Sequence, residues 1–574
     1  MNLLNLPGRR YLILPALAMI LMILVVRADA AYRIVAPIDS SYGHIRQTYL
    51  YGEDGHKGVD YSIPTDTYLY AVANGIVVQV EEAYQNGCRP AGQPPLQCPA
   101  FGNFVLIRHY QRHYNRATGT MDYVYSLYAH LSQYSVALNV NDGVNAGQIV
   151  GRTDDTGNST GPHFHLQIMI DSTPDRTVTY PLSWTESGSR NPELWLTPYN
   201  GSTGTIIGKV TNINGNPLGN VTVFGLRKQS GWGYGSNLTY NYSALNPDDI
   251  LAENWGTTDV TPGRYEVTTS AGGTLGWHDV VAGQVTYVGL YPVWLPYVRS
   301  KNGWTSIIAV RNNSPTYRAQ VNITFFNRDG TVNYQPLTAV IAEGAQSTFG
   351  VPAGFDGGAL VVSSEDVAVV VREESGLELN DYNGVMAATN SGASRGWERA
   401  GTPVYVPIVK NARYGRSSKL FIMNTGLQPT TASVQFFNAD TGQAEGNVVS
   451  NDLAPYGSVS VKALDCAYPS NRCTARVTSS NNQPLAVAVL EQDDATTLGR
   501  ITYTGFSAGA RTNYVPLLKN NRYGMTTGLA VHNLGASATT VTVTCYDAAQ
   551  AYACGSTSVP GRGAAVLGGW AVPS

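Results

Sequence analysis

Five residues in the first third of the 574-residue chain are of types that bind and use a divalent metal ion. His56 and Asp60 stand in the string GHKGVD, His130 stands in YAHLS, and His163 and His165 stand in HFH directly after GNSTGP. Neutral imidazoles and carboxylates are good zinc ligands, and three protein ligands plus one water form the open arrangement of a catalytic zinc site. The residue types therefore predict a catalytic zinc centre.

The spacing of these residues constrains the local backbone. Residues four apart on an extended strand lie about 13 Å apart, so His56 and Asp60 can share one ion only if the chain bends between them, which Gly58 permits. His163 and His165 are two apart, and on a strand both would face the same side. Periodicity alone does not say which of these two histidines binds the metal.

Short strands must position these side chains. Within residues 31–197, alternating or apolar runs bounded by Gly and Asn predict strands at 69–72, 75–80, 104–107, 123–128 and 163–170. Only 13% of the residues are charged, and 60 Gly and 36 Tyr favour short strands and turns. We therefore expect an all-β protein with few helices.

Residues 40–170 resemble the lysostaphin-type zinc peptidases, also called glycyl-glycine endopeptidases. That family has H-x-x-x-D, then a His in Tyr-x-His-Leu, then H-x-H after Gly-Pro, and the strings AVANG and VNAGQIVG also look like it. The resemblance implies an antiparallel β-sheet peptidase domain that hydrolyses peptide cross-links of bacterial peptidoglycan. It assigns the zinc ligands to His56, Asp60 and His165, and the catalytic pair to His130 and His163.

The chemistry follows from these residue types. One carboxylate and two neutral imidazoles leave the site with a net charge of about +1, so zinc can lower the pKa of water toward about 7 and polarise a peptide carbonyl. The H-E-x-x-H helix with its Glu base does not occur in the sequence. Proton transfer must fall to His130 and His163, although either imidazole could instead stabilise the oxyanion.

The sequence departs from the family pattern in two places. Leu166 and Gln167 follow H-x-H where the family commonly has an aromatic residue and Glu, and we expect neither to touch the metal. An insertion carrying Cys88 and Cys98 lies between the H-x-x-x-D string and the Tyr-x-His-Leu string. We expect it to reshape one wall of the substrate-binding groove. The scissile bond stays open: glycine bridges, D-amino-acid cross-links and a secreted protein substrate all fit.

Other polar residues have simpler interpretations. A single His on a strand is more often a hydrogen-bonded core residue than a ligand, and the same holds for His44, His109, His113, His278 and His532. Asp154 and Asp155 precede Thr-Gly and are typical of a turn rather than a calcium site. The competing hypothesis for the domain is a non-catalytic wall-binding or amidase-activating module with an adhesin-like tail, but such modules typically lack some of the five residues.

The N-terminus predicts export. Arg9 and Arg10 precede a 16-residue apolar run, which is short for a bilayer span of about 20 residues, and ADA at 28–30 is typical of a signal-peptidase site. We expect cleavage after Ala30 and a secreted, extracellular or cell-wall protein without a stable membrane span; an uncleaved anchor is the alternative. The mature chain would carry 34 basic and 39 acidic residues, a net charge of −5, which argues against nucleic acid as a partner.

Six cysteines fall into three close pairs after this export signal. The pairs are Cys88–Cys98, Cys466–Cys473 and Cys545–Cys554. An even count in a secreted chain predicts short-loop disulfides. A four-cysteine zinc site is unlikely because C-x-x-C spacing does not occur.

The sequence pattern changes after residue 197. Residues 198–290 are similar to carboxypeptidase-regulatory-like and collagen-adhesin B-type domains and predict a small β-sandwich from the strings TIIGKV, VTVF and PGRYEV. The strings PYVR, PIVK and PLLK then recur, beginning at Pro296, Pro407 and Pro516, and each precedes an apolar strand that ends in Asn. They predict β repeats at 291–400, 401–510 and 511–574. Only 58 residues follow Pro516, about half of a full module, so we expect either that the chain stops early or that the third module is incomplete. A cell-surface ligand is a candidate partner of this tail.

Overall fold

A computed structural model describes most of the chain. The described residues are 37–39, 45–47, 56–88, 98–115, 120–179, 188–195, 202–212, 216–227, 237–240, 253–272, 274–333, 336–376, 378–386, 400–426, 428–466, 471–495, 501–513, 515, 527–546 and 551–568. The predicted signal peptide at 1–30, His44 and the third repeat string at 516–519 lie outside them. Within the described residues, no helix is both long and apolar enough to cross a bilayer.

One antiparallel sheet forms the first part of the chain. Its strand order is β1 (Ile45–Gln47), β2 (Val59–Tyr61), β9 (Phe164–Asp171), β6 (Thr120–Leu131), β5 (Asn103–Asn115), β4 (Gly75–Glu81) and β7 (Gly143–Val144), with β10 (Ser189–Arg190) also paired to β9. A two-stranded sheet of β3 (Tyr68–Tyr70) and β8 (Ile149–Arg152) and the short helix α2 (Pro192–Trp195) complete it. The strands predicted at 75–80, 104–107 and 123–128 are confirmed, although β5 and β6 are much longer than predicted. The strand predicted at 69–72 ends at Tyr70, and the one predicted at 163–170 begins at Phe164.

The centre of this sheet is buried on both faces. Along β9 every residue from Phe164 to Ile170 is buried, including the polar His165 and Gln167, so both faces of this strand are covered. Val59, Val105, Val124 and Leu166 are among the fully buried side chains of the core on one face. The strands that carry the metal-binding candidates are therefore rigidly packed.

Two small sheets follow. Their orders are β14 (Trp255–Val260), β11 (Gly204–Gly208) and β17 (Val285–Val288) in one, and β13 (Asn237–Leu238), β12 (Thr222–Phe224), β15 (Gly263–Thr269) and β16 (Thr274–Val280) in the other. Their facing side chains, including Ile206, Val223 and Trp255, share one buried cluster. The two sheets thus enclose a core of their own, as a sandwich does.

The next strands form larger sheets. One nine-stranded sheet contains β18 (Tyr291–Lys301), β19 (Trp304–Asn312), β20 (Ala319–Phe326), β21 (Leu337–Ile341), β22 (Gln346–Gly350), β23 (Asp356–Ser363), β24 (Val367–Ser375), β25 (Glu378–Asn383) and β26 (Val385–Met386). Two four-stranded sheets contain β27 (Val404–Lys410), β28 (Arg416–Asn424), β29 (Thr430–Asn438), β30 (Ala444–Leu453), β31 (Ser458–Lys462), β32 (Arg472–Ser479), β33 (Leu485–Asp493) and β34 (Ile501–Thr504). The last pairs are β35 (Leu529–His532) with β38 (Ala564–Leu567), and β36 (Thr539–Tyr546) with β37 (Ala551–Val559).

The Asn residues that end the recurring apolar strands make the same contacts. The side-chain amides of Asn312 and Asn424 each donate to three backbone carbonyls, and that of Asn533 donates to two. Each Oδ1 accepts the backbone N–H two residues on. This shared geometry supports the predicted repeats. The boundaries of the repeats and of the sandwich stay predictions.

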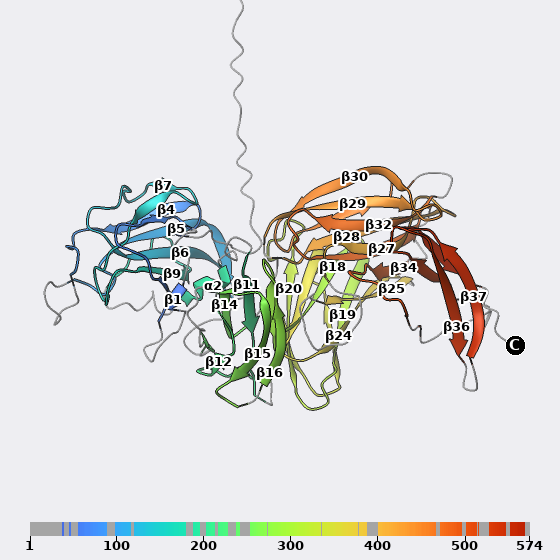
Figure 1. The fold of residues 1–574 in the computed structure, drawn as a ribbon, viewed down its shortest axis with the longest axis horizontal. Coiled ribbons are helices and arrows are strands. Elements are labelled where there is room, and N and C mark those ends of the chain that lie inside the picture. Colours follow the sequence, from blue (N-terminus) through green and yellow to red (C-terminus); the bar gives the residue numbers. More distant parts are fainter. Residues whose placement is uncertain are drawn as a thin grey trace, which may run out of the picture.

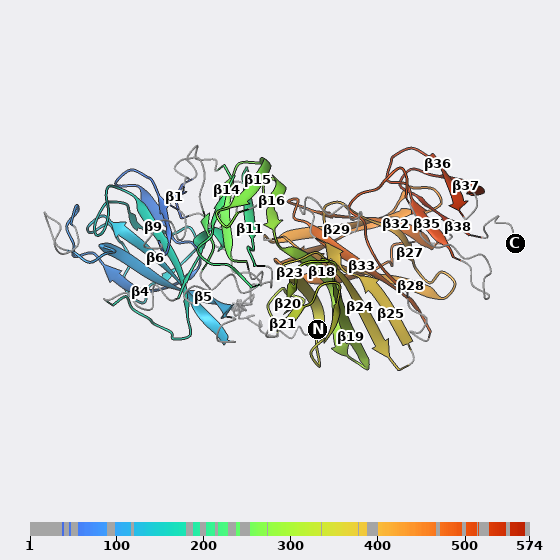
Figure 2. The ribbon, with the colours of Figure 1, turned by 90° about the horizontal axis from the view of Figure 1, so that it is seen from below.

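The parts follow one another in space in the order of the sequence. Figure 1 shows the β4–β9 sheet at one end of the molecule, the β11–β16 region next to it, and the β36–β37 hairpin at the other end; Figure 2 gives the same order from below. The fold is nearly all strand, as predicted. The three predicted disulfides, Cys88–Cys98, Cys466–Cys473 and Cys545–Cys554, are present in the structure.

Candidate metal centre

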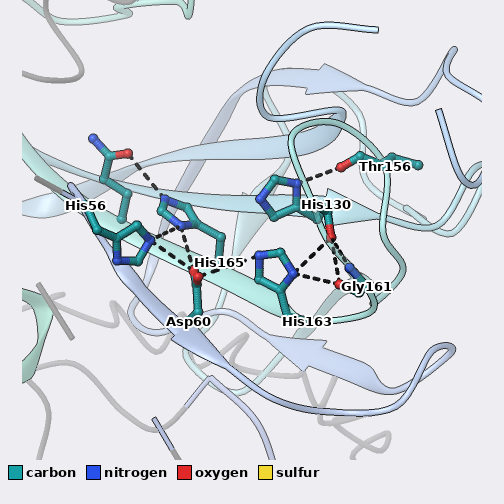
Figure 3. Close-up of polar contacts among 9 residues, drawn as sticks. His56, Asp60, His130, Thr156, Gly161, His163 and His165 are labelled. Atoms are coloured by element: carbon teal, nitrogen blue, oxygen red, sulfur yellow. Dashed lines mark hydrogen bonds and ion pairs between the residues drawn. The ribbon is translucent and has the colours of Figure 1, made fainter. Parts of the chain in front are cut away.

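Strand pairing brings the first three candidate residues together. Asp60 on β2 lies directly opposite His165 on β9 in the antiparallel register, and His56 lies just before β2. His165 Nδ1 is 2.9 Å from Asp60 Oδ1, and His56 Nε2 is 3.1 Å from the same oxygen and 3.0 Å from His165 Nδ1. Three potential ligand atoms therefore face one point, as Figure 3 shows.

The triangle of donor atoms fits a zinc ion. Ligand atoms held about 2.0 to 2.1 Å from a tetrahedral zinc lie roughly 3.3 Å apart, close to the 2.9 to 3.1 Å separations of these three atoms. Two imidazole nitrogens and one carboxylate oxygen are also the donor types that zinc prefers. The site needs only a slight expansion to hold the ion.

Gly58 is required here for space. An added Cβ would lie 2.4 Å from the Leu166 backbone oxygen and 2.7 Å from His165 Cε1. The chain bends at Lys57 and Gly58, as the spacing of His56 and Asp60 predicted, although Gly58 is not among the glycines with positive φ. Its missing side chain also allows the segment before β2 to approach the His165 ring.

We expect Gly58→Ala to lose most of its metal. The new methyl group must push β2 away from β9, which separates His56 and Asp60 from His165, and overpacking of this kind costs about 1 to 3 kcal/mol. Elemental analysis of the purified variant measures the loss. Gly143→Ala on β7 is the control, since its Cβ would meet nothing nearer than the Tyr110 hydroxyl at 3.5 Å; equal zinc in both variants would contradict the prediction.

The other two histidines lie beside this triangle. His163 Nε2 is 3.7 Å from Asp60 Oδ2, and the His130 and His163 rings have centroids 4.5 Å apart. The loop before β9 holds both rings: His130 Nδ1 donates to the Thr156 carbonyl at 2.6 Å, and His163 Nδ1 donates to the Gly161 carbonyl at 2.9 Å. Because each Nδ1 carries the hydrogen, Nε2 of each neutral ring presents a lone pair.

Burial and neighbouring charges tune these groups. Burial, followed by the charges of His163 and His165, holds the pKa of His130 well below its usual range, so this ring is neutral. Burial alone would raise the pKa of Asp60, but hydrogen bonds to His165 and His56 outweigh it and hold that pKa well below normal. Burial also lowers the pKa of His165, so this ring is neutral beside the ionised Asp60 carboxylate, which is the state that binds a metal.

The structure brings all five predicted residues together, and it adds two residues that the sequence had not placed at the centre. Gln167 Oε1 lies 3.5 Å from His165 Nε2, so this residue contacts a candidate ligand. Thr156, which belongs to a predicted turn, holds His130 through its carbonyl. That turn is local, since the Asp155 N–H donates to Asp154 Oδ1 at 2.8 Å.

Two of the remaining histidines are hydrogen-bonded core residues, as predicted. Buried His109 bonds the Ser126 hydroxyl at 2.9 Å and the Asn74 carbonyl at 3.2 Å, and burial lowers its pKa to about 4. His278 bonds the Leu275 carbonyl at 2.9 Å. Neither lies with the five candidates.

Known proteins resemble the region around this centre. The model of peptidase family M23 matches residues 54–176. The DD-carboxypeptidase/endopeptidase Mpg of Neisseria meningitidis is 32% identical over 145 residues, which cover 25% of this chain and 27% of that protein. Lysostaphin of Staphylococcus staphylolyticus is 30% identical over 132 residues, which cover 23% and 22%. The peptidoglycan DD-endopeptidase ShyA of Vibrio cholerae is 27% identical over 119 residues, which cover 21% of each chain.

The similarity is confined to one part of the molecule. The chain spans about a quarter of the length of these relatives. Among solved structures, the catalytic domain of lysostaphin from Staphylococcus simulans is 24% identical and has a TM-score of 0.17, with 26% of this chain and 86% of that chain covered. The sequence match and the motifs inside it agree on one assignment: residues 54–176 form a peptidase family M23 domain.

Proposed function

We propose that this protein is a secreted zinc metalloendopeptidase that hydrolyses peptide cross-links of bacterial peptidoglycan. The observation that carries the proposal is the triangle of His56, Asp60 and His165, with the fixed rings of His130 and His163 beside it. A module that only binds wall would need none of these side chains. Their joint presence favours the enzyme over the non-catalytic alternative.

The ligands in this proposal are His56 Nε2, Asp60 Oδ1 and His165 Nδ1. A bound zinc ion supplies Lewis acidity that activates water for attack and polarises the peptide carbonyl. Gln167 accepts the hydrogen of His165 Nε2 and so directs Nδ1 toward the ion, a role that outer hydrogen-bond partners commonly have in zinc sites. Phe101 packs beside the His165 ring, with centroids 5.9 Å apart, and limits its rotation.

The pair His130 and His163 performs the proton transfer. Because the Thr156 and Gly161 carbonyls hold the Nδ1 hydrogens, the neutral rings can only accept a proton at Nε2. This tautomer favours a general base over an oxyanion donor in the first step. After a ring has taken the proton from water, its Nε2–H can deliver that proton to the leaving amine.

The substrate is proposed from the relatives. Mpg is a DD-carboxypeptidase/endopeptidase and ShyA is a peptidoglycan DD-endopeptidase, and lysostaphin represents the family that the sequence resembles. A wall substrate requires export, which the N-terminal pattern predicts. The β modules after residue 197 are proposed to position the peptidase domain on a cell-surface ligand.

Digestion of purified cell walls tests the proposal. Walls with glycine bridges and walls with direct D-amino-acid cross-links are incubated with the purified chain, and the released peptides are identified by mass spectrometry. We expect one zinc per chain by elemental analysis and one type of cross-link cut at a single bond. A chain that contains zinc and binds walls but releases no peptide from either substrate would support the non-catalytic alternative instead.

A further inference from the structure

A buried network outside the candidate ligands connects three segments behind His130. Asn103, at the start of β5, is fully buried. Its side chain accepts the Tyr84 N–H at 3.0 Å and donates to the carbonyls of Tyr84 at 2.7 Å and Leu131 at 3.2 Å. Its backbone N–H donates to Thr156 Oγ1 at 3.1 Å. Every polar group of this side chain is therefore used to hold neighbouring backbone.

Thr156 is the second member of the network and is also fully buried. Its hydroxyl donates to the Leu131 carbonyl at 2.9 Å and accepts from Asn103, so the residue is fixed from two sides. Its own carbonyl accepts the hydrogen of His130 Nδ1 at 2.6 Å. The position of that carbonyl decides both the tautomer and the orientation of the His130 ring.

His130 itself needs such support. Its φ is +60°, a left-handed conformation that is unfavourable for residues other than Gly and persists only where the surroundings impose it. Its N–H donates to the Phe101 carbonyl at 3.0 Å, and its carbonyl accepts from the Asp154 N–H at 2.9 Å. Both neighbours belong to the segments that Asn103 and Thr156 join.

The two segments are packed backbone against backbone. Gly102 has φ of +59°, and an added Cβ would lie 2.4 Å from the Thr156 carbonyl carbon. The Gly157 N–H donates to the Cys88 carbonyl at 3.0 Å, and the Asn158 N–H donates to the Ala100 carbonyl at 2.7 Å. The segments that flank the Cys88–Cys98 disulfide thus form the surface on which the loop carrying Thr156 rests.

We infer that Thr156 and Asn103 are positioning residues that hold His130 in its Nδ1–H tautomer, with Nε2 turned toward the reaction. The inference rests on the proposed function. Neither residue is a candidate metal ligand, and neither is placed to touch substrate. Their removal should therefore slow turnover without removing the metal.

Thr156→Val and Thr156→Ser test the inference in the full chain. Val keeps the shape but lacks the hydroxyl, whereas Ser keeps both hydrogen bonds. We expect Thr156→Val to keep one zinc per chain and to lose kcat by about 10- to 100-fold, the usual range for outer partners of a metal site, with KM nearly unchanged. Thr156→Ser should recover most of the activity of the wild type.

Asn103→Asp provides a second measurement if the Val variant folds poorly. The substitution keeps Oδ1 as the acceptor for Tyr84 but replaces the donor that holds the Leu131 carbonyl, so kcat should again fall while zinc is retained. Thr205→Val is the control, because Thr205 is equally buried and bonds Thr258 at 3.0 Å far from the site; its kcat should equal that of the wild type.

The outcomes separate this inference from the proposed function. If the wild type cleaves walls and Thr156→Val has an unchanged kcat, the positioning role is wrong while the enzyme stands. Loss of zinc in Thr156→Val or Asn103→Asp would also overturn it, since the network would then support the ligands. An equal loss of kcat in Thr156→Ser would show that the hydroxyl is not the group that matters. Wild-type protein without cleavage would contradict the proposed function itself.

Discussion

His130→Ala and His163→Ala should each keep one zinc per chain and lose turnover by about 10² to 10⁴, the usual contribution of a positioned acid or base. The three candidate ligand atoms lie on His56, Asp60 and His165, so neither substitution removes one of them. Each removes an Nε2 lone pair whose direction a backbone carbonyl fixes. Zinc content and the initial rate of peptide release are measured on the same preparations.

The double variant His130→Ala/His163→Ala sharpens this test. If the two rings act in one proton-transfer path, the double variant should be little slower than the worse single variant, because residues that act as a unit are not additive. His109→Gln serves as the control, since His109 is a buried hydrogen-bonded core residue of the same sheet. Full activity of both single variants would contradict the mechanism even if zinc were present.

The sequence predicted the fold class because local patterns specify it. Apolar runs bounded by Gly and Asn predicted strands β4 and β9, and close cysteine pairs after a predicted export signal predicted the disulfides. The order of the strands could not be found in this way. β2 and β9 are neighbours although more than 100 residues separate Asp60 from His165 along the chain, and no local period encodes that pairing.

The candidate residues were predictable because their spacing is unusual, but the support behind them was not. His163 and His165 face one site as their two-residue spacing suggested, although His163 precedes β9 and is held by a bridge to Asp154. The bend at Gly58 was predicted, but its close approach to Leu166 and His165 was not, since both lie on another strand. Thr156 holds His130 through its backbone carbonyl and is itself held through its hydroxyl, and no local sequence pattern indicates either contact.

Gln167 illustrates the same limit. Sequence comparison marked it only as a departure from a Glu and placed it away from the metal. Its side chain lies two residues beyond His165 on the same face of β9 and is buried, with Oε1 3.5 Å from His165 Nε2. Strand alternation could have suggested this contact, because residues i and i+2 share a face, but not that the face is closed to water.

Asp60→Asn and His165→Ala should lose most of the zinc and, with it, all measurable wall cleavage. Asp60→Asn keeps the size of the side chain but removes the only negative charge among the three candidate ligands, and it places an amide where a carboxylate oxygen now lies 2.9 Å from His165 Nδ1. His165→Ala removes a ligand atom outright and leaves two, too few for a catalytic zinc site with one open position. Elemental analysis, followed by attempted rescue with added zinc, measures both.

A buried histidine elsewhere controls for a general effect of the substitution. His278→Ala removes an imidazole from β16, where it bonds the Leu275 carbonyl, and it should keep zinc and activity. The comparison of His165→Ala with His163→Ala decides the roles of the two histidines in H-x-H, because both face Asp60. His163 Nε2 lies 3.7 Å from Asp60 Oδ2, and His165 Nδ1 lies 2.9 Å from Asp60 Oδ1. The shorter contact and the closed triangle with His56 favour His165 as the proposed ligand. If His163→Ala sheds the metal while His165→Ala keeps it, that assignment is reversed, and His165 must then be the proton acceptor.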